Sequence, residues 1–297
     1  MTDEKPLAYT VADISAVVCT LNSISSIEQC LASLRAAGVG EVIVVDATST
    51  DGTYAIAERM ADLVLTDPGH GLGAARNLGI ARTSKPLILN MGSDNLAAPH
   101  ALERMIAVLS DSSAHNLRGV SAQTLIDGDS YLASGLNAWR RGRFLVGPAA
   151  VIGTPTLFIG DTLRAHPYDS SRRFSDDSEL CERWTREFAA SFAITDAIFY
   201  EIGKTSWDEI RVRCRMYGIS DYEVFADGNA SGWSAQRKAQ SLLHPARVDL
   251  VHPLRNLKPV DAAKALPFLL AFTAMRYESW ATRALRSRGA AGSDAAQ

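Results

Sequence analysis

The chain has 297 residues, of which 47% are hydrophobic and 21% are charged, a balance typical of a folded globular protein. This length allows one large domain or two halves that share a sheet. Its formal net charge of −3 argues against a surface built mainly to bind a polyanion, so we expect no nucleic acid partner.

The cysteines and the apolar runs indicate the cellular compartment of the protein. The four cysteines are scattered, without the spacing of a zinc site, so we interpret them as core residues in a reducing compartment. The N-terminus is polar, and no stretch reaches the ~18 uninterrupted apolar residues of a membrane span. We therefore expect a soluble, cytoplasmic protein.

Short apolar runs alternate with amphipathic helical patterns in the first third of the chain. Residues 14–19 (ISAVVC) and 41–46 (EVIVVD) are typical of buried parallel strands, and a helix ending at Gly38 lies between them. We further expect strands at 62–66 and 86–91 and helices at 51–61, 73–83 and 99–110. This alternation predicts an α/β fold with a mostly parallel central sheet flanked by helices.

Polar side chains follow three of these strands. Thr20 and Asn22 follow the first strand, Asp46 ends the second, and Ser93 and Asp94 follow the strand at 86–91. Ligands of such sheets bind beyond the carboxyl ends of the strands. The sequence therefore predicts one binding site at this edge of the sheet.

Asp46 has two interpretations. A carboxylate at a strand end can accept hydrogen bonds from a ribose or a base. Alternatively, Asp46 caps the turn that follows it. We prefer the ligand role because Ser49 and Asp51 already supply turn and cap residues.

The segment 69–77 (GHGLGAARN) is glycine-rich and opens a helix that contains Arg76. Glycines let the backbone approach a diphosphate, a helix N-terminus favours anions, and arginine pairs with phosphate through two hydrogen bonds. The alternative for Arg76 is a surface salt bridge. The glycines do not follow the first strand and the last glycine of a dinucleotide fingerprint is absent, which disfavours a dehydrogenase.

The order of these motifs resembles glycosyltransferase family 2, inverting enzymes with the GT-A fold. The resemblance runs through roughly the first 110 residues, over VVCTLN, EVIVVDATSTDGT, GLGAARNLGI and LILNMGSDN. It implies a nucleotide-sugar donor, with Thr20, Asn22 and Asp46 near the nucleoside. It places Arg76 beside the diphosphate, and Ser93 among the donor-binding residues.

The same resemblance implies a divalent metal, Mn2+ or Mg2+. Asp94 occupies the last position of the family's Asp-X-Asp signature, whereas Gly92 stands where the family has its first acid. Magnesium-type ions typically need only one or two protein carboxylates when a diphosphate and water supply the other oxygens. Asp94 can therefore serve alone, and His252 is a further candidate ligand.

A second acidic motif, FSDDSELCER, opens a helix with a buried stripe at Leu180, Cys181 and Trp184. Taken alone, Asp176 and Asp177 are best explained as acids that stabilise the helix N-terminus. The resemblance instead implies that Asp177 is the general base and that Asp176 supports it. A carboxylate suits this role, because inverting transfer needs a base to remove the proton of the acceptor hydroxyl.

The later part of the chain is less informative. Arg211 and Arg215 lie on one face of an expected helix, where they form a solvated basic face or, as an alternative acceptor-side role, reach an acceptor phosphate. The apolar, then arginine-rich segment 265–288 can dock on the core, which we prefer, or lie on an anionic membrane surface.

We expect a GT-A domain at 1–235, followed by a helical C-terminal extension at 236–288 and a disordered tail at 289–297. Within the GT-A domain we expect a nucleotide-binding half at about 8–110 and an acceptor half at about 111–235. The Gln-x-x-Arg-Trp element of processive synthases is absent. The sequence thus predicts a metal-dependent, single-addition glycosyltransferase of glycan, glycolipid or polysaccharide biosynthesis.

Its acceptor would be a glycan, a lipid-linked molecule or a small molecule. Two alternatives stay open: a catalytically inactive GT-A-like nucleotide-binding or regulatory protein, motivated by Gly92, and a nucleotidyltransferase, which shares the strand–helix layout. Contact with the inner face of a membrane and a homodimer are also open.

Overall fold

The computed structural model describes residues 9–67, 69–111, 113, 115–171, 176–203 and 206–294, and the side chains of these as far as residue 287. Two compact units divide the chain. The first comprises Met1–Leu125 and Val146–Ile202, and the second comprises Ile126–Leu145 and Gly203–Gln297. The functional domains predicted at 1–235 and 236–288 follow a different division, and they stay a prediction.

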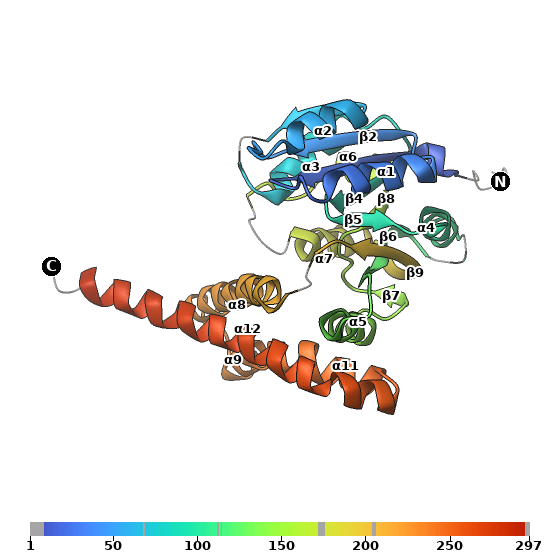
Figure 1. Cartoon of the computed structure of the whole chain (residues 1–297). Helices are drawn as coiled ribbons and strands as arrows, with labels where there is room; N and C mark the ends of the chain where they lie inside the picture. Colours follow the sequence, from blue (N-terminus) through green and yellow to red (C-terminus); the bar gives the residue numbers. More distant parts are fainter. Residues whose placement is uncertain are drawn as a thin grey trace. The chain divides into compact units, whose positions relative to one another are not determined.

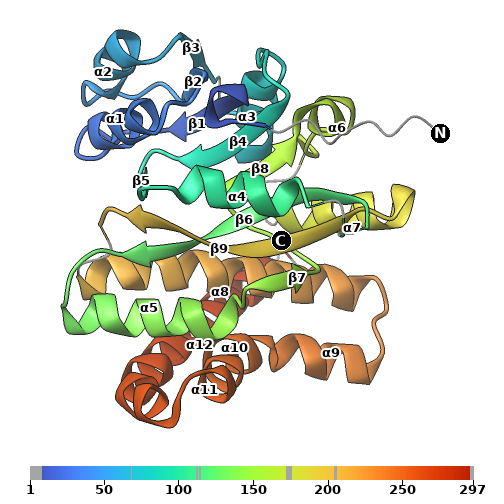
Figure 2. The same cartoon turned by 90° about the vertical axis from the view of Figure 1, so that its right-hand side faces the viewer.

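A mixed sheet forms the first unit. Its strands are β1 (Ile14–Thr20), β2 (Glu41–Asp46), β3 (Leu63–Thr66), β4 (Leu87–Gly92), β5 (Asn95–Ala97), β6 (Leu117–Ile126), β7 (Gly147–Ala149), β8 (Thr156–Ile159) and β9 (Ser191–Glu201). Among the described residues the order is β3-β2-β1-β4-β8-β6-β9-β5, with β7 paired to β9 (Figure 2). The first four strands pair in parallel, and β8 begins the antiparallel part.

Helices cover both faces of this sheet, as predicted (Figure 1). They are η1 (Val11–Asp13), α1 (Ile27–Ala37), α2 (Thr53–Met60), α3 (Leu72–Ile80), α4 (Ala101–Leu109), α6 (Gly160–Ala165) and α7 (Asp176–Phe188). Ala16 and Val18 of β1 pack in the core cluster that contains α1 and α4. Val17 points to the opposite cluster with α3 and α7, because successive strand residues face opposite sides. The α/β class is confirmed.

Helix α1 illustrates how local sequence sets these elements. Cys30, Leu31 and Leu34 are fully buried at helical spacing, and Gly38 ends the helix with φ of 83°, a left-handed conformation that glycine adopts without strain. Ser26 stands at the N-cap position, but its hydroxyl donates to the carbonyl of Ser23 instead of capping the helix. The predicted end of the helix at Gly38 is confirmed.

The second unit is helical. It contains α5 (Tyr131–Arg143), α8 (Trp207–Ala230), α9 (Ala235–Leu242), α10 (His244–Ala246), the π-helix η2 (Arg247–Val251), α11 (His252–Asn256) and α12 (Pro259–Asp294). Trp139, Cys214, Phe268 and Phe272 bring α5, α8 and α12 into one core, because their side chains are buried together. The apolar part of segment 265–288 therefore docks within this unit, as we preferred.

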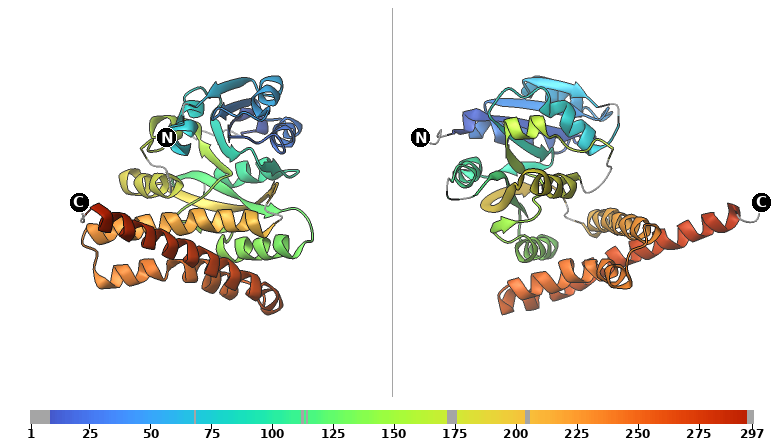
Figure 3. Two further views of the ribbon diagram at one scale, coloured as in Figure 1. Left: turned by 60° about the vertical axis from the view of Figure 1, so that its left-hand side comes forward. Right: turned by 180° about the vertical axis from the view of Figure 1, so that it is seen from behind.

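Helices α8 and α12 lie along each other (Figure 3). Gly218 permits this close approach, since a Cβ at this position would collide with the carbonyl oxygen of Arg276. The expected disordered tail at 289–297 is helical as far as Asp294, and its last three residues lie outside the described part. No helix in the described residues is long and apolar enough to span a membrane.

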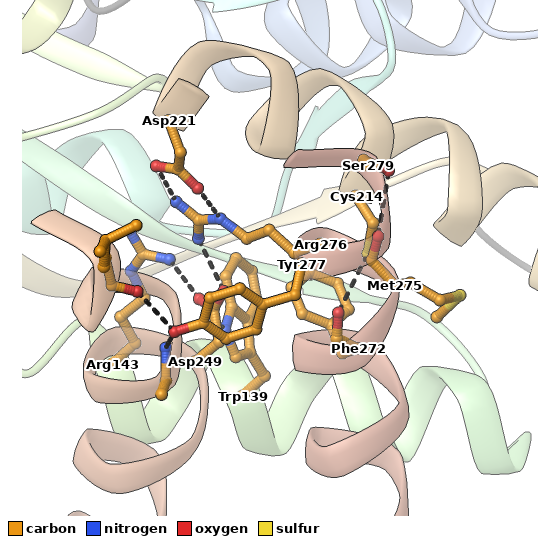
Figure 4. A network of polar contacts seen from close by, with 12 residues as sticks. Trp139, Arg143, Cys214, Asp221, Asp249, Phe272, Met275, Arg276, Tyr277 and Ser279 are labelled. Atoms are coloured by element: carbon orange, nitrogen blue, oxygen red, sulfur yellow. Dashed lines mark hydrogen bonds and ion pairs between the residues drawn. The ribbon is translucent and has the colours of Figure 1, made fainter. Parts of the chain in front are cut away.

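A buried polar network joins the helices of the second unit (Figure 4). Asp249 of η2 is fully buried and accepts hydrogen bonds from Trp139 Nε1 at 3.0 Å, Arg143 at 2.7 Å and Arg276 at 2.6 Å. Arg276 also donates twice to Asp221, at 2.6 and 2.8 Å. A buried carboxylate is tolerated only when it is paired in this way, so the network holds α5, α8, η2 and α12 in register.

Three cysteines have the core role that we predicted. Cys30, Cys181 and Cys214 are buried free thiols, and Cys19 is partly exposed. Burial raises the pKa of Cys181 and of Cys214 to about 12, because the thiolate form loses its hydration. These thiols are therefore unreactive at neutral pH.

Candidate active site

Three strand ends meet at one edge of the first unit's sheet. Thr20 pairs with Asp46 across β1 and β2, and Cys19 pairs with Gly92 across β1 and β4. The carboxyl ends of the three strands are therefore level. The predicted meeting of these polar clusters is confirmed.

Asp46 takes part in the turn that follows β2. Its side chain is 1% exposed, and both carboxylate oxygens are used: Ser49 donates its backbone N–H to Oδ2 at 2.8 Å and its hydroxyl to Oδ1 at 2.5 Å. Our reason for preferring a ligand role, that the turn does not need Asp46, was therefore wrong. A contact of Asp46 with the nucleoside stays a prediction.

Thr20 and Asn22 lie at the end of β1, next to the loop that follows β2. Asn22 has φ of 47° and its side-chain oxygen accepts the backbone N–H of Thr50 at 2.9 Å, which ties the end of β1 to the loop after β2. Thr20 Oγ1 is buried and has no hydrogen-bond partner among the described residues. An unsatisfied buried hydroxyl is costly, which makes Thr20 an unusual residue at this strand end. The predicted contact of Thr20 with a donor stays a prediction.

The end of β4 carries the expected metal-binding acid. Asn95 donates its side-chain N–H to Asp94 Oδ1 at 2.8 Å, and Ser93 donates to the Ser23 hydroxyl at 2.8 Å. A Cβ on Gly92 would lie 2.9 Å from Asp94 Oδ1, closer than real Cβ atoms approach. Glycine at position 92 is therefore what allows the present orientation of the Asp94 carboxylate.

The residues present fit a hard divalent cation. No group of three or more His, Cys, Asp or Glu side chains gathers at one place among the described residues, and the role of Asp94 as a metal ligand stays a prediction. Asn95 Oδ1 beside it is buried and lacks a partner in the described part of the chain. Carboxylate and amide oxygens suit Mg2+ and Mn2+, which take their remaining ligands from phosphate and water.

A buried ion cluster joins α3 to α7. NH1 of Arg76 donates to Asp176 Oδ2 at 2.6 Å and to Asp177 Oδ1 at 2.9 Å. The Arg76 side chain is 6% exposed, so the alternative of a surface salt bridge is wrong. Asp177 keeps 23% of its side-chain surface exposed, whereas Asp176 keeps 12%. Of the two acids, Asp177 is the more accessible to an incoming molecule.

Tyr168 and Asn90 complete this cluster, and sequence reasoning missed both. The Tyr168 hydroxyl donates to Asp177 Oδ1 at 3.3 Å, and Asn90 donates to that hydroxyl at 3.4 Å. Arg76 stacks over the Tyr168 ring, with its guanidinium carbon 5.0 Å from the ring centroid. A polar Asn90 inside the buried run LILNM was a signal for such a contact, whereas nothing local marked Tyr168.

The pKa of Asp177 is raised above the ordinary aspartate value. Burial is the largest cause, and the negative charge of Asp176 adds to it, while Arg76 and the hydrogen bond from Tyr168 oppose it. The balance that the sequence left open thus favours a more basic carboxylate. The same acids raise the pKa of Arg76, which stays protonated throughout.

The other predicted site residues belong to the second unit. Arg211 and Arg215 lie on α8 with exposed side chains, and His252 begins α11. The roles predicted for them, at the acceptor and at the metal, stay predictions.

The family model described as Glycosyl transferase family 2 matches residues 15–171, more than half of the chain. A curated relative, the succinoglycan biosynthesis protein ExoO of Rhizobium meliloti (strain 1021), is 36% identical over 107 residues. The match covers 34% of this chain and 31% of the relative, so the chain matches less than a third of that protein's length.

Two solved structures show a distant similarity. Glucosyl-3-phosphoglycerate synthase from Mycobacterium tuberculosis, in complex with Mn2+, UDP and glucosyl-3-phosphoglycerate, is 18% identical with a TM-score of 0.49, over 66% of this chain and 74% of that chain. S. aureus TarS is 15% identical with a TM-score of 0.49, over 90% of this chain and 54% of that chain.

Proposed function

The chain belongs to glycosyl transferase family 2, and we propose that it transfers a sugar from a nucleotide-diphosphate donor to an acceptor hydroxyl with inversion of configuration. The observation that carries the proposal is the buried pairing of Arg76 with a partly exposed Asp177 of raised pKa. We further propose a single-addition reaction in polysaccharide or glycan biosynthesis. The name of the R. meliloti relative, a succinoglycan biosynthesis protein, supports the biosynthetic context.

Asp177 is the general base of this proposal. Its Oδ1 accepts hydrogen bonds from Arg76 and Tyr168, while Oδ2 has no donor among the described residues. Oδ2 is thus the oxygen free to take the proton from the acceptor hydroxyl as that hydroxyl attacks the anomeric carbon. The raised pKa suits the task, since a more basic carboxylate removes a proton more readily.

The strand ends bind the donor in this scheme. Thr20, Asn22 and Asp46 face the nucleoside, and Ser93 lies beside Asp94 at the diphosphate. Arg76 uses only NH1 for the acids, and its Nε and NH2 groups make no hydrogen bond within the described part of the chain. A single guanidinium can therefore hold the base and also donate to the leaving diphosphate.

Asp94, with Asn95 beside it, would hold the divalent cation. When bound, such an ion neutralises charge that develops on the departing diphosphate. The protein's own part is to orient Asp94, which Gly92 and Asn95 do through the contacts described above.

A donor-hydrolysis and transfer screen tests the proposal. The chain is incubated with a panel of nucleotide-diphosphate sugars, with Mn2+, with Mg2+ and with a chelator, and release of the nucleoside diphosphate is measured. We expect release from one donor class, dependent on the metal. Absence of release from every donor, together with absence of nucleoside-diphosphate binding by calorimetry, would contradict the proposal.

A catalytically inactive nucleotide-binding or regulatory protein is the second candidate. One observation favours it: Gly92, at the end of β4, supplies no second carboxylate beside Asp94. Calorimetry separates the two candidates, because an inactive protein binds a nucleoside diphosphate but releases none from any donor. Membership of the family weighs against a nucleotidyltransferase.

A further inference from the structure

A groove of about 220 Å³ runs between α8 and α12 of the second unit. Four arginines line it: Arg211 and Arg215 from α8, and Arg283 and Arg286 from α12. Glu278 is the acid among the lining residues. The two helices that form the groove lie side by side in both views of Figure 3. Although the whole chain is slightly acidic, this surface is strongly basic.

The arginines are poorly compensated by the protein itself. Arg211 lies 3.7 Å from Asp208 and Arg283 lies 3.5 Å from Glu223, both in exposed pairs that contribute little. Arg215 and Arg286 make no ion pair among the residues that the structure describes. Like charges spaced four apart on a helix, as Arg211 and Arg215 are, destabilise it. An anion in the groove would relieve this repulsion.

The chemistry of the lining points to phosphate. The planar guanidinium matches phosphate oxygens with two parallel hydrogen bonds, and it is weakly hydrated, so it gives up water easily. Arg283 is already oriented, with its guanidinium carbon 6.0 Å from the centre of the Tyr222 ring. The volume is below the ~300–1,000 Å³ of pockets that enclose drug-sized ligands, so it suits a headgroup rather than a whole nucleotide sugar.

Exposed apolar side chains beside the arginines indicate that the phosphate is attached to a lipid. Val212 is 61% exposed and Met216 is 55% exposed, each next to an arginine on α8, and Leu285 on α12 is 68% exposed. None of the three lines the groove itself, but each is adjacent in sequence to an arginine that does. Helices that lie in a membrane interface typically carry exposed apolar side chains next to basic ones. A soluble phosphate would have no use for these apolar neighbours.

We propose that the groove between α8 and α12 binds the phosphate of anionic lipid headgroups and docks the protein on a membrane surface, with Val212, Met216 and Leu285 entering the interface. The site lies outside the residues assigned to sugar transfer in the first unit. It gives the arginines of α8 a definite ligand, whereas the sequence favoured a solvated basic face over contact with an acceptor phosphate.

Vesicle flotation of the full chain tests the proposal. We expect partitioning onto phosphatidylcholine vesicles that contain phosphatidylglycerol, and much less onto phosphatidylcholine alone. A basic residue near an anionic surface contributes about 1 kcal/mol, so Arg215→Gln should lower the partition coefficient about fivefold, and the double variant with Arg286→Gln about 30-fold. Raising the salt concentration should weaken binding of the unaltered chain.

A matched double variant controls for net charge. Arg237→Gln with Arg255→Gln removes the same charge from exposed positions of the second unit outside the groove, so its partitioning should stay close to that of the unaltered chain. Circular dichroism checks that all variants remain folded. Val212→Ser with Met216→Ser should weaken partitioning that survives at high salt.

Three outcomes would overturn the proposal. One is that the unaltered chain does not partition onto anionic vesicles. Another is that the groove variant and the control variant lose binding equally. The third is that calorimetry finds inorganic phosphate bound through Arg215 and Arg286 while anionic vesicles are not bound, which would assign the groove to a soluble phosphate. Each of these measurements is independent of sugar transfer.

Discussion

The guanidinium of Arg76 lies 2.9 Å from Oδ1 of Asp177, although the two residues are 101 positions apart in the chain. One belongs to the glycine-rich segment expected beside a diphosphate, and the other belongs to the motif expected to supply the base. The contact therefore couples the two halves of the proposed chemistry. It orients one oxygen of Asp177 and leaves the other available.

Replacing the base should remove activity without removing the donor site. Asp177→Asn keeps the shape of the side chain but cannot accept a proton, so we expect transfer to fall about 10²- to 10⁴-fold, the usual contribution of a general base. Binding of the nucleoside diphosphate, measured by calorimetry, should persist. The control Asp161→Asn alters a side chain that is 94% exposed on α6 and should leave the rate unchanged. Near-normal turnover of Asp177→Asn would refute the assignment.

Asp176, the acid next to the proposed base, should affect the pH dependence of the transfer rate. Asp177 must be ionised to act, so activity falls as the pH drops through its raised pKa. Asp176→Asn removes a negative charge that helps to raise that pKa, so the acidic limb of the pH–rate profile should move to lower pH. An acidic limb that stays in place, or that moves to higher pH, would show that Asp176 does not act on the base.

A methyl group at position 92 should disturb the metal site. Gly92→Ala places a Cβ 2.9 Å from Asp94 Oδ1, so the carboxylate must turn away from its hydrogen bond with Asn95. We expect the affinity for Mn2+ in the presence of a nucleoside diphosphate to fall about 10- to 100-fold, as for other changes that misorient a ligand. Adding Mn2+ should therefore raise the Tm of Gly92→Ala by less than it raises the Tm of the unaltered chain.

Gly153→Ala is the matched control, because nothing lies within 4 Å of the added Cβ. If Gly92→Ala and Gly153→Ala respond to Mn2+ alike, Asp94 is not oriented in the way described above.

The buried network of the second unit should be structural. Asp249→Ala leaves the cations of Arg143 and Arg276 without their shared partner, so the free energy of unfolding should fall by about 3–5 kcal/mol. Urea unfolding measures this change. Asp227→Ala, at an exposed position of α8, should alter it by no more than about 0.5 kcal/mol. Comparable small effects from both substitutions would contradict the structural role.

Much of the first unit could be predicted because its elements are set by local pattern. The strand predicted at 41–46 is β2, Glu41–Asp46, and α1 ends at Gly38 as expected. Asp46 shows the limit of this reasoning. Its two bonds to Ser49 depend on how the turn folds over the carboxylate, and any of several residues could have served that turn.

The sequence by itself determined the α/β class, the polar residues at three strand ends and the position of Asp177 in the first turn of α7, because hydrophobic periodicity and strand order are local properties. Only the tertiary structure decided that Arg76 is buried against Asp177 and that Tyr168 joins them, since these contacts close long loops between α3 and α7. It also decided that α5 packs against α8 and α12, because buried side chains from these distant segments share one core.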